Sequence, residues 1–474
     1  MQPPPGNRSV RLTRPPDTHI HLDAFLEFDG PCNKFAMFEK LIIRFQSKIG
    51  AMVILSDVWP EFRPNGGPVF RHAPTAMNET TKPPAARQVH DYSVILIAIA
   101  CALAILFTVL FLSLLPFDRQ IVARRDFIVY WATGQQLVHH QNPYDPPALN
   151  QIERDAGFTG GASYYMRNTP WALPLAYPLG YFGAQASALP WSLLMLALLI
   201  ASVRLLWKML GRPGRHLDWL GYCFPPALFC VILGQTSVLL LFGLVLFLYL
   251  HKTHPFWAGA ALWLCTIKPH LFLPFAVVLL VWIFVSRSFR ILAGGISAMA
   301  VGCFITEIVD PHAFAQYMHY MRTSTITHEF TACFGDLLRD RINPNAEWLA
   351  FIPAFLGCIW ALIYFWPRRH QWDWLEGGSL LVLVSVLVAP FGWIFDQSLA
   401  LPAVMVGATR TQSKLLLALL AVIYILIEIE VNRYDLHSAA YLWTAPGWLI
   451  WFLFARASAR RAGTAQVAAL TSLG

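Results

Sequence analysis

Long apolar runs recur from residue 93 to residue 455 and are separated by mostly short connections. An apolar run of about 18 residues is long enough to cross a bilayer as an α-helix. Several runs are shorter than a straight span requires, and we expect these to be tilted, broken or re-entrant. The sequence thus predicts an all-α polytopic membrane protein with about 10–12 transmembrane helices. The predicted spans are 93–116, 187–208, 219–234, 236–250, 256–267, 270–286, 291–309, 347–366, 378–395, 397–408, 414–430 and 440–455.

The composition agrees with this class. Of the 474 residues, 56% are hydrophobic and 13% are charged, a charged share about half that of ordinary soluble proteins. This excludes a disordered protein, a coiled coil and a typical cytosolic enzyme. The net charge of +8 does not indicate a nucleic-acid partner, because the basic residues form short clusters between apolar runs. The eight cysteines contain no Cys-x-x-Cys pair, so neither a metal site nor a disulfide framework is expected.

Residues 1–90 differ from the rest of the chain. They are polar and rich in proline, and no stretch in them reaches the roughly 18 apolar residues of a span. We expect a disordered cytoplasmic extension here, then one transmembrane domain over 91–460 and a cytoplasmic tail over 461–474. Met77 is an alternative start site, because it would open a short polar leader before the first span. We expect residues 1–76 to be dispensable for insertion and activity.

The lysines and arginines of the short connections lie on one side of the predicted bundle. Alternate connections are rich in them, for example Arg204–Arg215, Arg287–Arg290 and Arg456–Arg461. The positive-inside rule assigns that side, and with it both termini, to the cytoplasm. The two long loops, 117–186 and 310–346, then face the outside of the cytoplasmic membrane. We expect water-facing chemistry to depend on these loops.

Six segments carry a resemblance to a known family. In chain order they are Asp126–Gly134, Asn142–Asp145, Asn168–Pro174, Gly234–Ser237, Thr266–His270 and Ala389–Asp396. Together they resemble motifs of glycosyltransferase family 87, a group of integral membrane enzymes of the GT-C superfamily. The prolines that the family has side by side in the third segment are separated here, as Pro170 and Pro174. The resemblance covers about residues 93–455.

The resemblance implies a hexosyltransferase with a GT-C-type helix bundle and interfacial helices in the first outer loop. Its donor would be a polyprenyl-phosphate-linked sugar, with mannose favoured, and its acceptor a glycolipid or glycan at the outer face of the membrane. Such enzymes need no nucleotide-sugar domain, and the sequence has neither a Gly-rich phosphate loop nor an Asp-x-Asp metal motif. The residues identify no cofactor with certainty beyond this donor substrate, and the expected partners are membrane lipids and the two substrates.

Asp126 is the candidate general base. It precedes an aromatic segment, Phe127 to Trp131, that is expected at the membrane interface. An inverting sugar transfer needs a carboxylate that accepts the proton of the acceptor hydroxyl, whereas the leaving phosphate needs hydrogen-bond donors or cations. Alternatively, Asp126 is the N-cap of an interfacial helix over 127–140 and pairs with Arg125. The two roles are compatible.

Lys268 interrupts an apolar stretch that runs from Phe256 to Phe284. A charge at membrane depth is costly and indicates function by default. Pro269 breaks the helix beside it, and Lys268 is a candidate ligand of the donor phosphate. The alternative is a lysine that extends to the outer interface at a tight turn. For the neighbouring His270 we favour packing over a role in the site.

Five further residues are weaker candidates. Gln235 is expected either to bind sugar or phosphate or to cap a helix, and Arg167 either to face lipid phosphate or to be solvated. Asp396 is expected either to orient a cation or acceptor hydroxyl or to end a helix. Tyr144 can stack on a sugar ring, but turn packing is favoured. Asp145 lies between Tyr144 and a Pro-Pro pair, which favours a turn carboxylate.

A second class of function remains open at this stage. A transporter or flippase for a lipid-linked or anionic solute would use Lys268 and the broken helices as a binding site at the membrane midplane. Such proteins usually contain an inverted repeat, and the hydropathy pattern shows none. The long aromatic outer loop also favours an interfacial enzyme.

Overall fold

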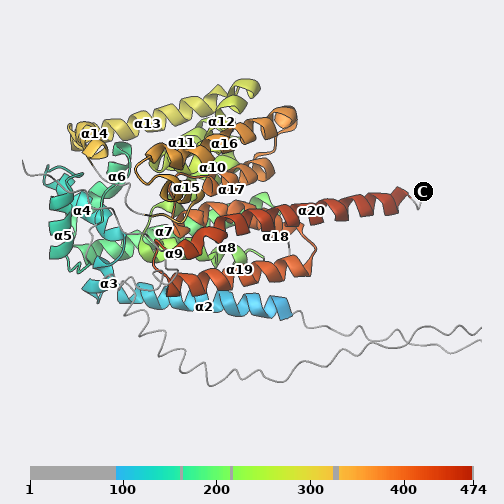
Figure 1. The fold of residues 1–474 in the computed structure, drawn as a ribbon, viewed down its shortest axis with the longest axis horizontal. Helices are drawn as coiled ribbons and strands as arrows, with labels where there is room; N and C mark the ends of the chain where they lie inside the picture. The colour runs from blue at the N-terminus through green and yellow to red at the C-terminus, as the bar shows by residue number, and fades with distance from the viewer. Residues whose placement is uncertain (1–91, 161–163, 214–216, 324–329, 472–474) are drawn as a thin grey trace, which may run out of the picture.

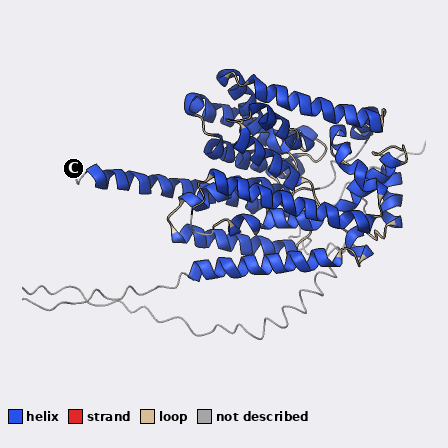
Figure 2. Ribbon diagram, turned by 180° about the vertical axis from the view of Figure 1, so that it is seen from behind, coloured by secondary structure: helices blue, strands red, loops and turns tan. Residues whose placement is uncertain are grey.

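The computed structural model describes residues 92–160, 164–213, 217–323 and 330–471, and every regular element within these ranges is a helix (Figure 2). The predicted all-α class is therefore confirmed. The predicted extension over 1–90 lies outside the described residues. The α-helices are α2 (Tyr92–Leu114), α3 (Arg119–Ala123), α4 (Phe127–Val138), α5 (Pro146–Asp155), α6 (Leu173–Ala176), α7 (Ala184–Met209), α8 (Trp219–Tyr222), α9 (Pro225–Leu233), α10 (Ser237–Leu250), α11 (Pro255–Ala261), α12 (Leu273–Ser286), α13 (Phe289–Val309), α14 (Ala313–Thr323), α15 (Phe334–Ile342), α16 (Ile352–Phe365), α17 (Ser379–Leu387), α18 (Leu401–Arg410), α19 (Lys414–Arg433) and α20 (Thr444–Thr471).

Short 3-10 and π turns join these helices. They are η2 (Pro170–Ala172), η3 (Tyr177–Tyr181), η4 (Leu264–Ile267), η5 (Pro269–Phe272), η7 (Glu347–Phe351), η8 (Trp366–Gln371), η9 (Trp374–Gly378), η10 (Ile394–Ala400) and η11 (Ala439–Trp443). Prolines open many of these elements, because a proline fits the first turn of a helix but cannot donate inside it. The breaks between elements divide the predicted spans into pieces.

Five helical segments among the described residues are long and apolar enough to cross a membrane. They are Ala184–Met209, Pro269–Ser286, Phe289–Val309, Glu347–Gln371 and Lys414–Arg433. Shorter apolar helical segments are Ala104–Leu114, Trp219–Leu233, Ser237–Leu250, Pro255–Ile267 and Trp374–Leu387. The chain is a polytopic membrane protein, and the short segments agree with the expectation of broken or tilted spans.

The break in one predicted span affects the position of a predicted site residue. The sequence predicted a span over 378–395, but α17 ends at Leu387 and η10 begins only at Ile394. Pro390 and Gly392 lie in the intervening segment, and neither residue favours a helix interior. This break positions Asp396 inside the bundle, rather than at the end of an apolar run.

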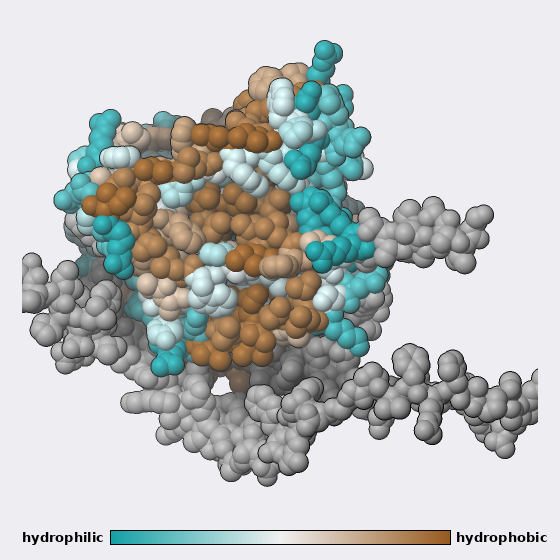
Figure 3. Space-filling model, turned by 45° about the vertical axis from the view of Figure 1, so that its right-hand side comes forward, coloured by the Kyte–Doolittle hydropathy of each residue, from teal (hydrophilic) through white to brown (hydrophobic). Residues whose placement is uncertain are grey.

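The lipid-facing surface is apolar. Figure 3 shows a broad hydrophobic region bordered by hydrophilic residues. Phe304 and Ile308 on α13 are each 66% exposed, and Phe355 and Ile363 on α16 are 67% and 68% exposed. A surface of this kind would be unfavourable in water but is well solvated by acyl chains.

The helices that follow α2 gather at one end of the bundle. In Figure 1, α3, α4 and α5 lie at the end opposite to that toward which α20 extends. Helix α4 packs closely on η3, because a Cβ at Gly134 would clash with the backbone of Ala176 and Gly180. Phe127 and Ile128 of α4 are fully buried. The described segment between α2 and α7 is thus a packed layer that holds the residues of α4 in fixed positions.

Candidate functional site

The turn between α9 and α10 is held against the start of α4. Helix α9 ends at Leu233, and Gly234 follows with a φ of 73°, in the left-handed region that glycine adopts readily. Arg125 donates from Nε to the Ile232 carbonyl at 2.5 Å and from Nη2 to the Val231 carbonyl at 3.0 Å. The last carbonyls of a helix lack partners within it and carry partial negative charge, so a guanidinium satisfies them well. This contact fixes the residues that follow the glycine.

Arg125 is committed to this structural role. Its side chain is buried and also donates to Ser192 Oγ at 2.8 Å. Burial lowers the pKa of Arg125 to about 9, so the guanidinium remains protonated at neutral pH. The ion pair with Asp126 that the sequence suggested as an alternative does not form, because the guanidinium is directed at α9.

Asp126 is directed at Gln235. Its Oδ2 accepts a hydrogen bond from Gln235 Nε2 at 2.8 Å. Asp126 precedes α4 but makes no side-chain hydrogen bond to the helix, so the predicted N-cap interaction is absent. The residue is only 6% exposed. In the described part of the chain no group donates to its Oδ1, and that oxygen is free to accept from a substrate.

The Gln235 amide links the Asp126 carboxylate to the Lys268 ammonium. While Nε2 donates to Asp126, Oε1 accepts from the Tyr130 hydroxyl at 2.8 Å and from Lys268 Nζ at 3.5 Å. These partners fix the orientation of the amide, because a flipped amide would direct its donor at a hydroxyl and an ammonium. Burial raises the pKa of Tyr130, so its hydroxyl stays protonated and remains a donor. Gln235 therefore connects α4 to the break between η4 and η5.

Lys268 forms a buried ion pair with Asp396. The distance from Lys268 Nζ to Asp396 Oδ1 is 2.7 Å, and the two side chains are 10% and 1% exposed. Ser237 Oγ lies 3.3 Å from the ammonium and donates to the same carboxylate oxygen at 2.5 Å. The ammonium also lies 4.9 Å from the centre of the Phe395 ring. A buried pair of this kind is stable only when hydrogen bonds satisfy both members, as they do here.

A second contact holds Asp396 in place. Its Oδ2 accepts from the backbone N–H of Trp393 at 3.1 Å, which closes the first turn of η10. The sequence left open whether Asp396 orients a cation or ends a helix; in the structure it pairs with the Lys268 ammonium and lies in the first turn of η10. The result is a continuous polar chain across the bundle: Asp126, Gln235, Lys268 and Asp396.

The motif segments around this polar chain also contact one another. Trp171 Nε1 donates to Thr266 Oγ1 at 3.1 Å, close in sequence to Lys268. The Tyr144 hydroxyl donates to the Asn168 carbonyl at 3.0 Å. The six segments that resembled family motifs in sequence are therefore connected in space.

Four further predicted residues have other surroundings or positions in the described structure. Tyr144 is 2% exposed and packs on the rings of Tyr317 and Tyr320, which is the packing role that the sequence favoured. Asp145 precedes α5 without a side-chain cap hydrogen bond. His270 lies beside Phe391, with ring centres 6.4 Å apart. Arg167 is half-buried in the loop before η2.

Three residues of the site were missed by the sequence-based prediction: Tyr130, Ser237 and the structural Arg125. Tyr130 lies four residues after Asp126 and therefore shares its helix face; this spacing was a signal that could have been used. Ser237 gave no signal of its own.

No group of three His, Cys, Asp or Glu residues in the described ranges is placed to hold a metal ion.

Comparison with known proteins gives a match to one family. Residues 165–390 match the model of glycosyltransferase family 87. Gln235 and Lys268 lie within the match, whereas Asp126 and Asp396 lie on either side of it. No curated protein and no solved structure shows significant similarity. This match agrees with the family that the sequence motifs suggested: residues 165–390 are similar to glycosyltransferase family 87, and that family together with the membrane-spanning helices indicates a membrane glycosyltransferase.

Proposed function

We propose that this glycosyltransferase moves a hexose from a polyprenyl-phosphate donor to a glycolipid or glycan acceptor, with Asp126 as the general base. The polar chain from Asp126 to Asp396 is the observation that carries the proposal. It sets a carboxylate with one unengaged oxygen in the same network as a buried ammonium. A transfer from a phosphate donor needs these two groups.

Asp126 accepts the proton of the acceptor. As the acceptor hydroxyl oxygen attacks the anomeric carbon, its proton moves to Asp126 Oδ1. The bond from the anomeric carbon to the phosphate oxygen breaks, and polyprenyl phosphate leaves with the electron pair. The hydrogen bond from Gln235 to Oδ2 holds the carboxylate plane and keeps Oδ1 toward the acceptor.

Lys268 stabilises the charge of the leaving phosphate. Its contact with Gln235 is long, at 3.5 Å, so a phosphate oxygen can replace that contact without breaking the ion pair with Asp396. Asp396 and Ser237 then hold the ammonium in place. This is positioning combined with electrostatic stabilisation.

We place this site at the outer face of the cytoplasmic membrane, with both termini inside, on the distribution of lysine and arginine among the connections. A donor whose lipid tail lies in the bilayer reaches a site at this end of the bundle without leaving the membrane. Mannose is the first sugar to test, because the resemblance to the family implies it.

The test is an assay of the purified full-length protein with a panel of polyprenyl-phosphate sugars. We expect transfer from one lipid-linked hexose, with release of polyprenyl phosphate, and no transfer from the corresponding nucleotide sugars. Transfer from a nucleotide sugar alone would contradict the proposed donor. Movement of an intact lipid-linked sugar across proteoliposomes, without release of polyprenyl phosphate, would instead support the flippase alternative.

A further inference from the structure

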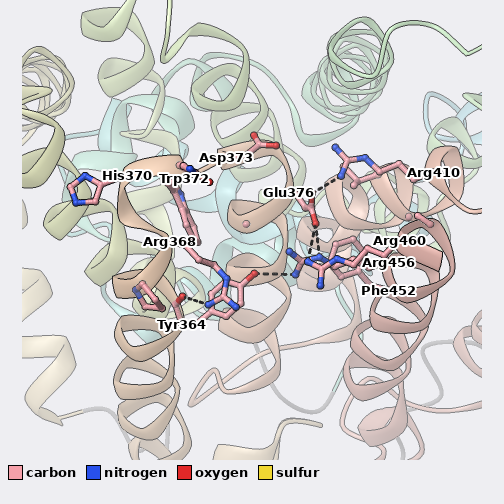
Figure 4. A pocket seen from close by; sticks show the side chains of 16 residues that line it. Tyr364, Arg368, His370, Trp372, Asp373, Glu376, Arg410, Phe452, Arg456 and Arg460 are labelled. Atoms are coloured by element: carbon pink, nitrogen blue, oxygen red, sulfur yellow. Dashed lines mark hydrogen bonds and ion pairs between the residues drawn. The ribbon is translucent and has the colours of Figure 1, made fainter. Parts of the chain in front are cut away.

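A large cavity in the described part of the chain is remote from the Asp126 network. It has a volume of about 710 Å³ and lies between the segment after α16, the start of η9, the end of α18 and the middle of α20 (Figure 4). These segments belong to the end of the bundle from which α20 projects, opposite to α4 (Figure 1). By the positive-inside rule this is the cytoplasmic end.

The cavity wall carries more positive than negative charge. Among the described residues that line it, the basic groups include four arginines and the acidic groups are Asp373 and Glu376. The arginines are Arg368, Arg410, Arg456 and Arg460. Such an excess of cations around a cavity attracts an anion, because the anion reduces their mutual repulsion.

One carboxylate is shared by three of these arginines. Glu376 accepts from Arg410 Nη1 at 2.6 Å and pairs with Arg456 Nε at 2.5 Å, and Arg460 Nη2 lies 3.9 Å away. The four side chains converge in Figure 4. The single negative charge of Glu376 does not neutralise both Arg410 and Arg456, the two guanidinium groups that lie closest to it. Both arginines also line the cavity, where they can bind an oxyanion.

The arginines are fixed by their surroundings. Arg456 donates to the Tyr364 hydroxyl at 3.0 Å, and Arg368 donates to the Tyr364 carbonyl at 2.7 Å while lying 4.3 Å from the centre of its ring. The Arg456 side chain is 18% exposed, that of Arg410 is 40% exposed and that of Arg460 is 68% exposed. The guanidinium groups therefore form a series from the interior of the cavity to its mouth.

Lipid-facing side chains lie beside this mouth. Ile363 and Trp366 are 68% and 56% exposed, and they are the sequence neighbours of Tyr364 and Pro367, which line the cavity. A membrane lipid whose acyl chains lie against these residues would have its headgroup at the level of the arginines.

We infer that this cavity binds the phosphate headgroup of an anionic membrane lipid, separately from the sugar-transfer site. Guanidinium groups bind phosphate in bidentate geometry, and the adjoining apolar surface selects a lipid over a soluble phosphate. Glu376 acts as a resident anion, which pairs with the arginines when no lipid is bound and competes with the headgroup when one is present. The inference is independent of the sugar and acceptor proposed above.

The experiment measures lipid binding to the full-length protein in nanodiscs. Wild-type protein is compared with the double variant Arg410→Gln/Arg460→Gln in phosphatidylglycerol and in phosphatidylcholine, and inorganic phosphate is added in a separate arm. We expect the double variant to lose about tenfold in phosphatidylglycerol affinity. The matched control is Arg290→Gln, an exposed arginine on a basic connection that does not line the cavity. It should change the affinity by less than about twofold.

The Glu376→Gln variant should change phosphatidylglycerol affinity in the opposite direction. Removing the resident carboxylate should raise phosphatidylglycerol affinity about threefold or more, because the headgroup no longer competes with it. Equal binding by the wild type and the double variant would overturn the inference. Displacement of the lipid by millimolar inorganic phosphate would overturn the assignment to a lipid, and weaker binding by a folded Glu376→Gln protein would overturn the competing role of Glu376. A loss of transfer activity with unchanged lipid binding would not support it.

Discussion

Two ion-pair clusters lie at opposite ends of the bundle, and their charge ratios are reversed. Near α4, one ammonium, Lys268, is linked to two carboxylates, Asp396 directly and Asp126 through Gln235. At the other end, one carboxylate, Glu376, is surrounded by three arginines. The first cluster is almost fully buried, whereas the second opens into a cavity.

The difference shows what each cluster is suited to do. Buried charges must be matched by fixed hydrogen bonds, and the geometry that results is rigid enough for proton transfer and charge stabilisation. A cavity wall in which the described arginines outnumber the carboxylates is suited to binding an external anion. On the functions proposed above, one end of the bundle carries out sugar transfer and the other binds an anionic lipid. The following predictions test that separation, beginning with the largest expected effect.

The first prediction concerns the sides of the membrane. Single cysteines at Thr159, in the first long loop, and at Arg212, after α7, should label from opposite sides with an impermeant reagent. Both positions are exposed. Each cysteine should be labelled from one side of the membrane only, because the two clusters belong to different faces. Labelling of both cysteines from the same side would remove the basis for two separate ends.

The second prediction concerns the proton acceptor. Asp126→Asn keeps the size of the side chain and an oxygen that accepts from Gln235, but it removes the basic carboxylate. Turnover should fall by roughly two or more orders of magnitude, while donor affinity and yield stay near wild type. Asp155→Asn, an exposed carboxylate at the end of α5, is the matched control and should be nearly silent. A wild-type rate for Asp126→Asn would exclude it as the base.

The third prediction concerns Lys268. Lys268→Met leaves Asp396 buried without its cation, so stability should fall by about 3–5 kcal/mol, and donor binding should weaken by about tenfold. Adding Asp396→Asn should restore most of the stability, because the unpaired charge is removed, but not donor binding. Thermal unfolding and a lipid-phosphate binding assay separate the two effects. Recovery of donor binding in the double variant would show that Lys268 is structural only.

The fourth and smallest effect is expected at Tyr130. Tyr130→Phe removes one of the hydrogen bonds that orient the Gln235 amide but leaves the aromatic packing on Trp191. We expect turnover to fall by about three- to tenfold, which corresponds to one hydrogen bond of about 1 kcal/mol. Steady-state kinetics should place the effect on kcat more than on donor KM. A rise in donor KM with unchanged kcat would mean that Tyr130 contacts the donor rather than positioning Asp126.

The sequence predicted the helical class and most element positions, because membrane-spanning runs follow directly from hydrophobicity. Predicted spans such as 187–208 and 291–309 correspond to α7 and α13. The span over 378–395 was wrong, because a hydrophobicity window does not register the break that Pro390 and Gly392 introduce. The family was also readable from short motifs, since their order along the chain is itself a signal, and the match over residues 165–390 agrees with it.

What only the tertiary structure decided is which polar residues meet. Asp126, Gln235, Lys268 and Asp396 were separate candidates in sequence, and the partner of Lys268 lies 128 residues away. Local patterns carry no information about such contacts, because they depend on how the helices pack. The same holds for Arg125, which sequence proximity paired with Asp126 but which caps α9. Hydrophobicity determined where the chain crosses the membrane, whereas the need to satisfy every buried charge determined the arrangement of the site.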